Sequence, residues 1–253
     1  LMVGPTGSGK STTLYSMINA LNTSDRKIIT LEDPIEYGIT GVSQIPIDTS
    51  GGASFADGLR SVLRLDPDVV MIGEIRDADA ARTAIQASIT GHLVLSSFHA
   101  NSSSAAFSRM IDMIGQNPIF SSAIRLVIAQ RLVRKLADNK EEYEPDETTK
   151  NWVREVLSDL PDTYEKPDLD NFKLWKPVES DDNPFGYVGR MVIMEQLVVN
   201  EAIQKFLRGD EKEFHTEIVE SAAKKNGMAT LLQVGVLAAL RGETTLDEIN
   251  RVI

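Results

Sequence analysis

Short apolar runs alternate with stretches of helical periodicity along the first half of the chain. Three such runs, each rich in β-branched residues, predict buried strands over residues 27–31, 69–72 and 93–98. Apolar residues at helical spacing predict helices over residues 11–21, 54–65 and 77–90. This alternation of strands and helices favours a mostly parallel sheet covered by helices, so the predicted fold class is α/β.

The second half of the chain has a different pattern. Residues 138–182 contain 15 acidic and 6 basic side chains, several prolines and little sustained periodicity beyond a possible short helix over 148–160. We expect an acidic, partly irregular inserted subdomain there. A turn and strand over 186–195 follow it, and then a small helical subdomain, with helices predicted over 201–207, 215–225, 230–241 and 245–252.

Composition excludes several classes of protein. The chain has 253 residues, of which 42% are hydrophobic and 25% charged, as expected for a globular protein with a large core. Its longest apolar run, 234–240, is far shorter than the roughly 18 to 20 residues that cross a bilayer. The absence of cysteine excludes disulfides and thiolate metal sites and suits the cytoplasm. A net charge of -11 argues against nonspecific binding of nucleic acid.

A glycine-rich segment near the start of the chain has the spacing of a phosphate-binding loop. Residues 4–11 satisfy G-x-x-x-x-G-K-[ST] between a strand remnant and a helix-forming stretch, and we expect the missing part of that strand to lie upstream. Backbone N–H groups of such a loop face the phosphates, its lysine reaches the β- and γ-phosphates, and its hydroxyl binds Mg²⁺. We therefore predict a site for ATP and Mg²⁺. The predicted binding residues are Gly4, Pro5, Thr6, Gly7, Ser8, Gly9, Lys10, Ser11 and Thr12.

Two acidic segments follow predicted strands and therefore reach the same edge of the sheet as the phosphate loop. The strand 69–72 is followed by Glu74, which we predict to orient the attacking water or to contribute to the Mg²⁺ shell. The strand 27–31 is followed by Glu32 and Asp33, whose carboxylates can hold Mg²⁺-bound water or accept a proton. We expect Glu32 to be catalytic and Asp33 to contribute to metal binding. A solvated helix start or turn is the alternative explanation for these carboxylates.

Histidines and arginines add candidates for sensing and neutralising phosphate charge. His92 and His99 bracket the third predicted strand, and their odd spacing places them on opposite faces, so a joint metal site is not expected. His99, at the end of that strand, is placed to sense the γ-phosphate, although an ordinary packed histidine is the alternative. Arg60, Arg64 and Arg76 are candidates for the guanidinium that neutralises charge in hydrolysis, often on a neighbouring subunit.

These motifs occur together in an order that resembles one protein family. In chain order, they read GPTGSGKST, TLEDPIEY, LRSVLRLDPD, IGEIRD, TGH and FHAN. They resemble the type II secretion and type IV pilus ATPase family. The resemblance implies a RecA-like core in a cytoplasmic hexameric ring. In it, Lys10 matches the lysine of the phosphate loop, Glu32 and Glu74 match catalytic acids, and His92 and His99 match a histidine box.

The later segments resemble the assembly or secretion branch of that family rather than the retraction branch. They read RLVRKL, GYVGR, GMATL and GETTLDEI. Members of this branch usually carry a four-cysteine zinc site in the insert, but this chain has no cysteine, so no zinc is expected. Trp152 and Trp175 are candidates to anchor a small apolar cluster there instead. We expect an ATPase core over 1–136, an acidic insert over 137–190 and a C-terminal helical subdomain over 191–253.

The resemblance implies a motor that powers type IV pilus assembly or type II secretion from the cytoplasmic face of the inner membrane. Its expected partners are other copies of itself, an inner-membrane platform protein and cytoplasmic adaptors, with neither nucleic acid nor a membrane span. One alternative is a RecA-like nucleic-acid motor, which needs a basic groove or stacking aromatics, whereas 6% of this chain is aromatic. Another is a nucleotide-gated docking module that binds ATP without appreciable turnover.

Overall fold

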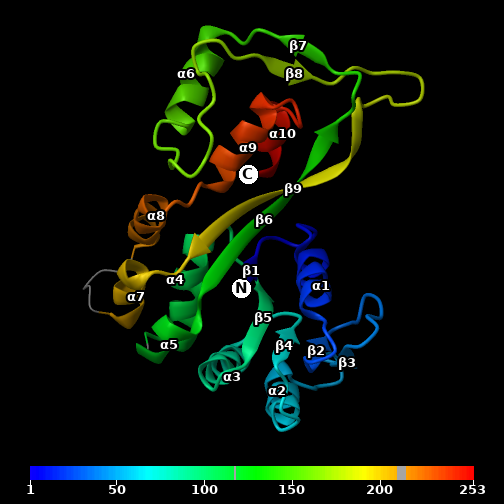
Figure 1. The fold of residues 1–253 in the computed structure, drawn as a ribbon, viewed down its shortest axis with the longest axis vertical. Helices are drawn as coiled ribbons and strands as arrows, with labels where there is room; N and C mark the ends of the chain where they lie inside the picture. The colour runs from blue at the N-terminus through cyan, green and yellow to red at the C-terminus, as the bar shows by residue number, and fades with distance from the viewer. Residues whose placement is uncertain (117, 210–214) are drawn as a thin grey trace.

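A seven-stranded sheet forms the centre of the computed structural model, which describes residues 1–116, 118–209 and 215–253 (Figure 1). Its strands are β1 (Met2–Val3), β2 (Ile28–Glu32), β3 (Ser43–Pro46), β4 (Val69–Ile72), β5 (Leu93–Phe98), β6 (Leu126–Leu136) and β9 (Tyr187–Val198). The strand order is β3-β2-β4-β5-β1-β6-β9, with β9 antiparallel to β6 and the other paired strands of the described sheet parallel. The predicted α/β class with a mostly parallel sheet is therefore confirmed.

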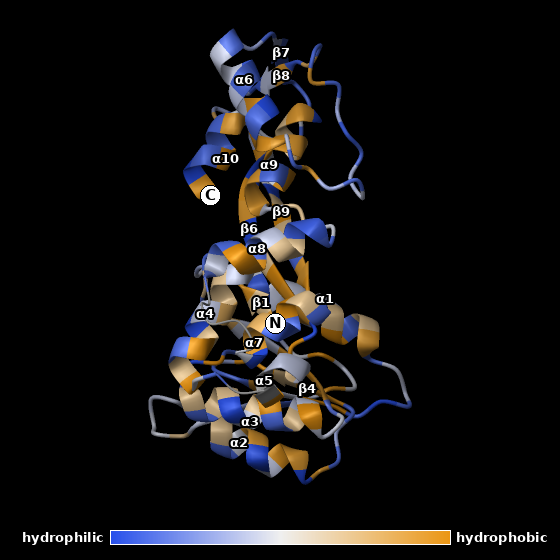
Figure 2. Cartoon of the chain, turned by 90° about the vertical axis from the view of Figure 1, so that its left-hand side faces the viewer, coloured by the Kyte–Doolittle hydropathy of each residue, from blue (hydrophilic) through white to orange (hydrophobic). Residues whose placement is uncertain are grey.

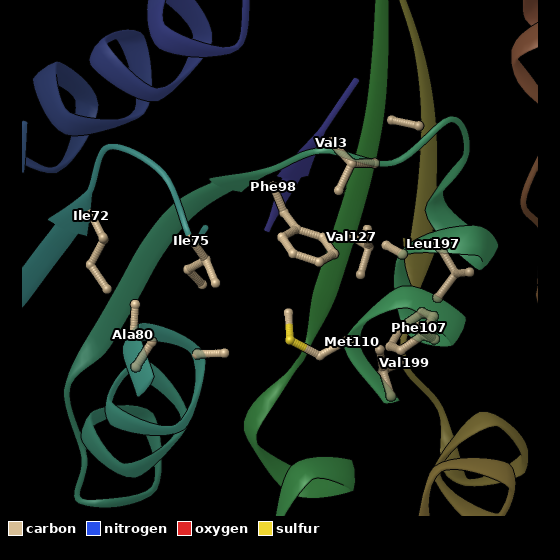
Figure 3. Close-up of a cluster of buried hydrophobic side chains, with 14 of the residues drawn as sticks. Val3, Ile72, Ile75, Ala80, Phe98, Phe107, Met110, Val127, Leu197 and Val199 are labelled. Carbon is tan, nitrogen blue, oxygen red and sulfur yellow. The ribbon is translucent and has the colours of Figure 1, made fainter. Parts of the chain in front are cut away.

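Helices cover both faces of the sheet because the buried strands carry apolar side chains on both faces. In β2, Ile29 and Leu31 belong to one cluster, whereas Ile28 belongs to another on the opposite face. The first cluster is covered by α2, α3 and α4, and Figure 3 shows Phe98 of β5 and Met110 of α4 within it. The second is covered by α1. The bounds are α1 (Lys10–Leu21), α2 (Phe55–Leu63), α3 (Ala78–Ile89) and α4 (Ser103–Ile114).

Side-chain caps fix where several of these helices begin. Ser54, Asp77 and Ser102 each accept a hydrogen bond from the backbone N–H three residues further on, at the starts of α2, α3 and α4. The predicted strands at β2, β4 and β5 and the predicted helices at α1, α2 and α3 are confirmed to within two residues. Beyond the predicted elements, the structure contains β3, α4, β6 and the short helix α5 (Pro118–Ala123).

A long antiparallel ribbon of β6 and β9 connects the sheet core to the acidic insert (Figure 1). The pairing runs from Leu126 opposite Val198 to Leu136 opposite Tyr187. The insert holds the two-stranded sheet of β7 (Glu141–Tyr143) and β8 (Leu174–Lys176), together with α6 (Glu147–Val156). The short helix expected over 148–160 is thus present as α6, and the strand expected over 186–195 is present as β9.

The C-terminal helices pack partly on the core and partly on the insert. They are α7 (Glu201–Arg208), α8 (Thr216–Lys225), α9 (Leu231–Leu240) and α10 (Leu246–Val252), as predicted. Ile203 of α7 and Val219 of α8 join the core cluster, whereas Val236 of α9 packs with Val153 and Leu174 of the insert. Figure 2 shows α9 as a largely hydrophobic helix close to the ribbon. Within the described ranges, none of the helices combines the length and hydropathy needed to cross a membrane.

Candidate functional site

The predicted phosphate loop lies between β1 and the start of α1, and glycines give it its shape. Gly7 and Gly9 have φ angles of 79° and 85°, which side chains rarely adopt. A Cβ atom at Gly4 would lie 2.7 Å from the Gln130 carbonyl oxygen, and one at Gly9 would lie 2.8 Å from Gln130 Nε2. The loop therefore needs glycine both for its backbone conformation and for its close contact with β6.

Gln130, on β6, fixes the loop to the helix that follows it. Its side chain is fully buried, its Nε2 donates to the Ser8 carbonyl at 2.7 Å, and its Oε1 accepts from Thr13 Oγ1 at 2.8 Å. These bonds connect the loop, α1 and β6 through one amide group. Gln130 is not among the predicted site residues, because β6 was not predicted and no local motif marks this glutamine.

Lys10 projects into a cavity of about 730 Å³ beside the loop. Its Nζ donates to the carbonyl oxygens of Gly4 and Pro5, at 2.8 and 2.9 Å. Burial lowers the pKa of Lys10, and the nearby charge of Glu74 acts in the opposite direction. Ser11 and Thr12, two of the predicted nucleotide-binding residues, line the same cavity.

Glu74 lies across this cavity from the loop, at the C-terminal end of β4. Its Oε1 is 2.5 Å from His99 Nε2, and its Oε2 accepts from Arg76 Nε at 2.6 Å. A Cβ at Gly73 would lie 3.3 Å from the Leu31 carbonyl oxygen, so this glycine allows the end of β4 to pack closely against β2. The structure thus brings together Glu74, His99 and Arg76, three of the residues predicted to be catalytic.

Glu32, at the end of β2, lines the cavity from a buried position. Its Oε2 accepts from the Tyr15 hydroxyl, and its Oε1 accepts from Thr30 Oγ1 at 2.5 Å and from Gln44 Nε2 at 3.1 Å. Burial, followed by the hydrogen bond to Glu32, raises the pKa of Tyr15 to about 12. Both carboxylate oxygens of Glu32 are therefore held by neutral donors, whereas those of Glu74 contact groups that can carry positive charge.

Asp33 points toward Arg76 at the edge of the same cavity. Its Oδ2 accepts from the Thr49 hydroxyl and lies 3.6 Å from Arg76 Nη1. Arg76 therefore lies between two carboxylates, and the hydrogen bond that it donates to Glu74 is the main reason that the pKa of Arg76 is raised. Asp33 thus lines the same cavity as Lys10 and Ser11 of the phosphate loop.

Two other predicted arginines and one histidine lie elsewhere in the described chain. Arg60 forms ion pairs with Asp57 at 2.8 Å and with Asp79 at 2.7 Å on the exposed surface of α2 and α3, and neither it nor Arg64 lines the described cavity. His92 Nδ1 is 3.0 Å from the Ala87 carbonyl oxygen, at the end of α3. His92 is therefore placed to cap a helix rather than to contact a phosphate, in contrast to His99.

The ribbon contributes residues to the cavity that the sequence analysis did not assign to a site. Leu132 of β6 and Arg190 of β9 line it on the side of the ribbon, and Tyr15 and Tyr37 line it near β2. The two tyrosine rings meet edge to face, with centroids 4.6 Å apart. Arg190 belongs to the segment GYVGR, which resembles the family. That resemblance does not by itself predict that Arg190 lines the cavity.

The chain is similar to known proteins over nearly its whole length. The family described as "Type II/IV secretion system protein" matches residues 1–251. The type II secretion system protein E of Xanthomonas campestris is 44% identical over the whole of this chain, and the type IV pilus assembly ATPase PilB of Pseudomonas aeruginosa is 40% identical over the whole chain. Since this chain covers 43% of each of these two proteins, it spans less than half of their length.

Solved structures show the same fold. The crystal structure of the pilus retraction motor PilT with bound ADP aligns with 99% of this chain and 60% of its own, with a TM-score of 0.68 and 28% identity. The Legionella pneumophila ATPase DotB aligns equally well, with a TM-score of 0.68 over 99% of this chain and 58% of its own, at 24% identity, which supports the fold alone. The core is therefore RecA-like, as predicted. From the match over residues 1–251 and the identity to both relatives, the chain belongs to the type II/IV secretion system protein family.

Proposed function

We propose that this chain is the ATP-hydrolysing motor domain of a protein that powers type IV pilus assembly or type II protein secretion. The observation that carries the proposal is that Lys10 of the phosphate loop and the Glu74–His99 pair line one cavity at the C-terminal edge of a parallel sheet. The names of the relatives, a secretion protein and a pilus assembly ATPase, support assembly or secretion, rather than retraction, as the work of the motor.

The groups around the loop fit a nucleotide. The Ser8 hydroxyl is buried without a hydrogen-bond partner among the described residues, and the Lys10 ammonium contacts loop carbonyls beside the cavity. Backbone N–H groups of the loop and of the first turn of α1 would hold the phosphates, and Lys10 would neutralise their charge. Gly4, Pro5, Thr6, Gly7 and Gly9 are proposed to shape this cradle.

The oxygen groups also fit magnesium, which prefers hydroxyl, carboxylate and water ligands. We propose that Ser11 binds Mg²⁺ directly and that Asp33 contributes through water. When bound, Mg²⁺ would supply positive charge against the phosphate oxygens. Glu74 would orient the attacking water and accept its proton, and His99, whose ring contacts Glu74, would hold that carboxylate and respond to the γ-phosphate.

The proposal extends to the surroundings of the motor. We propose that it works as a hexameric ring at the cytoplasmic face of the inner membrane, on a platform protein and its adaptors. Because Arg60 and Arg64 lie outside the cavity of their own chain, they would serve, if catalytic, the cavity of a neighbouring copy. Arg76, inside the cavity, would act within its own chain.

Turnover measured against protein concentration tests this function. The experiment follows Mg²⁺-dependent phosphate release from ATP while light scattering reports the size of the particle in the same samples, with Glu74→Gln as the control. A steep rise in specific activity with ring formation supports an oligomeric motor completed by neighbouring arginines. ATP binding without turnover at any concentration supports the docking-module alternative, and equal turnover by Glu74→Gln contradicts the assignment of Glu74.

A further inference from the structure

A buried carboxylate on β9, outside the nucleotide cavity, holds the first turns of two helices. Glu195 is only 3% exposed. Its Oε1 accepts the backbone N–H of Ser103, the first residue of α4, at 2.8 Å and also accepts the Ser103 hydroxyl. Its Oε2 accepts the backbone N–H of Leu231, the first residue of α9, at 3.1 Å. N–H groups in a first turn lack partners within their helix and carry partial positive charge, so a carboxylate stabilises both helices.

The α4 end of this contact is close to the nucleotide cavity along the chain. Only three residues separate His99, which contacts Glu74, from Ser103. Within that stretch, the Asn101 carbonyl accepts from Arg131 Nη2 at 2.8 Å. Burial lowers the pKa of Arg131, and the charge of Glu195 opposes this effect, so the two buried groups lie in each other's field. The segment 99–103 is therefore held at two points by the ribbon.

The other end of the contact leads away from the cavity. Leu231 begins α9, whose Val236 and Leu237 belong to the same buried cluster as Val153 and Leu174 of the insert. A shift of the His99 segment that disturbs one oxygen of Glu195 changes the acceptor geometry at the other. The same carboxylate thus connects the loop that carries His99 to the helix on which the insert packs.

We propose that Glu195 is a positioning residue that holds the His99 segment in place for hydrolysis and transmits occupancy of the nucleotide cavity to α9. This inference rests on the nucleotide-binding function proposed above. Binding of nucleotide against His99 fixes the segment 99–103, which fixes Glu195 Oε1 and, with it, the hydrogen bond from Oε2 to Leu231. In Glu195→Gln, an NH2 group replaces one carboxylate oxygen. One of the two helix starts then faces a donor instead of an acceptor.

Hydrogen exchange of α9 amides, with and without a non-hydrolysable Mg²⁺–ATP analogue, tests this connection. In the unaltered chain, we expect the analogue to slow exchange in residues 231–240 about fivefold, at the low end of ordinary coupling between sites. In Glu195→Gln, this response should fall below about twofold, while the dissociation constant of the analogue changes less than about threefold. Where the chain turns over ATP, kcat should fall about tenfold or more with little change in KM, because positioning rather than binding is lost.

Two further variants keep the test decisive. Glu201→Gln makes the same substitution at an exposed glutamate at the start of α7 and should behave as the unaltered chain. Ser103→Ala removes only the hydroxyl contact and should weaken the α9 response by an intermediate amount, and it carries the test if circular dichroism shows that Glu195→Gln does not fold. An α9 response that persists in Glu195→Gln, or is missing from the unaltered chain with analogue bound, overturns the inference. Failure of the unaltered chain to bind the analogue contradicts the proposed function instead.

Discussion

At the scale of single residues, two side chains of the cavity have different proposed roles: Lys10 binds the nucleotide, and Glu74 takes part in its hydrolysis. The Lys10 ammonium donates to two loop carbonyls and feels the charge of Glu74 across the cavity, so its removal would take away positive charge where we propose that the phosphates bind. We expect Lys10→Ala to weaken binding of Mg²⁺–ATP by about 2–4 kcal/mol. Glu74→Gln should bind almost normally but turn over about 10² to 10⁴ times more slowly. Calorimetric titration and phosphate release measure the two effects, and a Lys10→Ala chain that binds normally contradicts the role of the loop.

Gln130 gives a second prediction at this scale. Gln130→Ala leaves the Ser8 carbonyl and the Thr13 hydroxyl without their buried partner. We expect a loss of about 2 kcal/mol in the free energy of unfolding, from the unpaired groups and the cavity left behind. Nucleotide affinity should fall as well, because the loop loses its link to α1. Urea unfolding and titration with nucleotide check both effects, with Gln196→Ala on the same ribbon as an exposed control; equal stability of the two variants contradicts the prediction.

Comparing Lys10 with Gln130 shows which parts of the site can be predicted from the sequence alone. Lys10 lies within a local motif, and Glu74 and His99 lie within two residues of the ends of predicted strands, so neighbours in sequence are sufficient to place them. Gln130 acts only because folding brings it next to residues about 120 positions away in the chain. No local pattern records such a contact. Arg190 is a similar case, since its place in the cavity depends on the pairing of β6 with β9.

At the scale of elements, β6 shows why a buried strand can be missed. The strand β4 is a continuous apolar run, whereas β6 interrupts its apolar residues with Gln130, Arg131 and Arg134. Each of these polar side chains bonds to a segment distant in sequence, namely the phosphate loop, the Asn101 carbonyl and Glu248 of α10. The polar residues that break the apolar pattern of β6, and so prevent its prediction, are therefore the ones that connect this strand to the rest of the fold. By contrast, the start of α4 carries a local sequence signal, the N-cap residue Ser102.

The contact between β6 and α10 gives a prediction that depends on pH. Glu248 accepts hydrogen bonds from Arg134 at 2.7 Å and from Arg251 at 2.6 Å. Burial raises the pKa of Glu248, but hydrogen bonds from Arg251 and Arg134 outweigh it and lower the pKa from 4.5 to about 2. Because the folded-state pKa is the lower one, this stabilisation is present above pH 4.5 and is lost as the pH falls toward 2.

Comparison of the unaltered chain with Glu248→Gln measures this contribution. At pH 7, we expect the variant to lose about 1–2 kcal/mol of unfolding free energy, a value reduced by solvent screening at the two partly exposed arginines. The difference between the two chains should shrink at pH 3.5. Urea unfolding at both pH values gives the comparison, and a difference that stays constant with pH shows that the carboxylate charge is not its source.

At the scale of the whole molecule, the insert and the C-terminal helices form one buried cluster. Val153, Leu160 and Leu174 of the insert pack with Val236 and Leu246 from α9 and α10. The division of the chain at residues 136 and 190 remains a prediction, and β9 runs across the second of these positions. Hydrophobic packing in this shared cluster therefore holds an insert that has no cysteine. Trp152 packs against the edge of the cluster, and Trp175 lies against the turn after α9.

Substitution of Gly242, which contacts Trp175 of the insert, tests whether side-chain packing holds the insert in place. It follows the C-cap of α9 with φ +69°, and a Cβ there would lie 2.7 Å from Trp175 Nε1. Its carbonyl accepts from Lys140 Nζ at 2.6 Å, and the same ammonium lies 5.0 Å from the centroid of the Trp175 ring. An alanine at this position therefore strains the backbone and also pushes the Trp175 ring away from α9.

We expect Gly242→Ala to lower the free energy of unfolding by about 2–3 kcal/mol and to change tryptophan fluorescence. Gly227→Ala is the matched control, because Gly227 follows the C-cap of α8 at φ +94° but a Cβ there would meet only ordinary contacts at 3.4 Å. The control has the backbone strain without the clash, so the difference between the two variants measures the contact with Trp175. Because no zinc is expected in an insert without cysteine, we expect a metal chelator to leave the melting temperature of the unaltered chain unchanged. Equal destabilisation by both variants, or a lower melting temperature with chelator, means that the insert is held in another way.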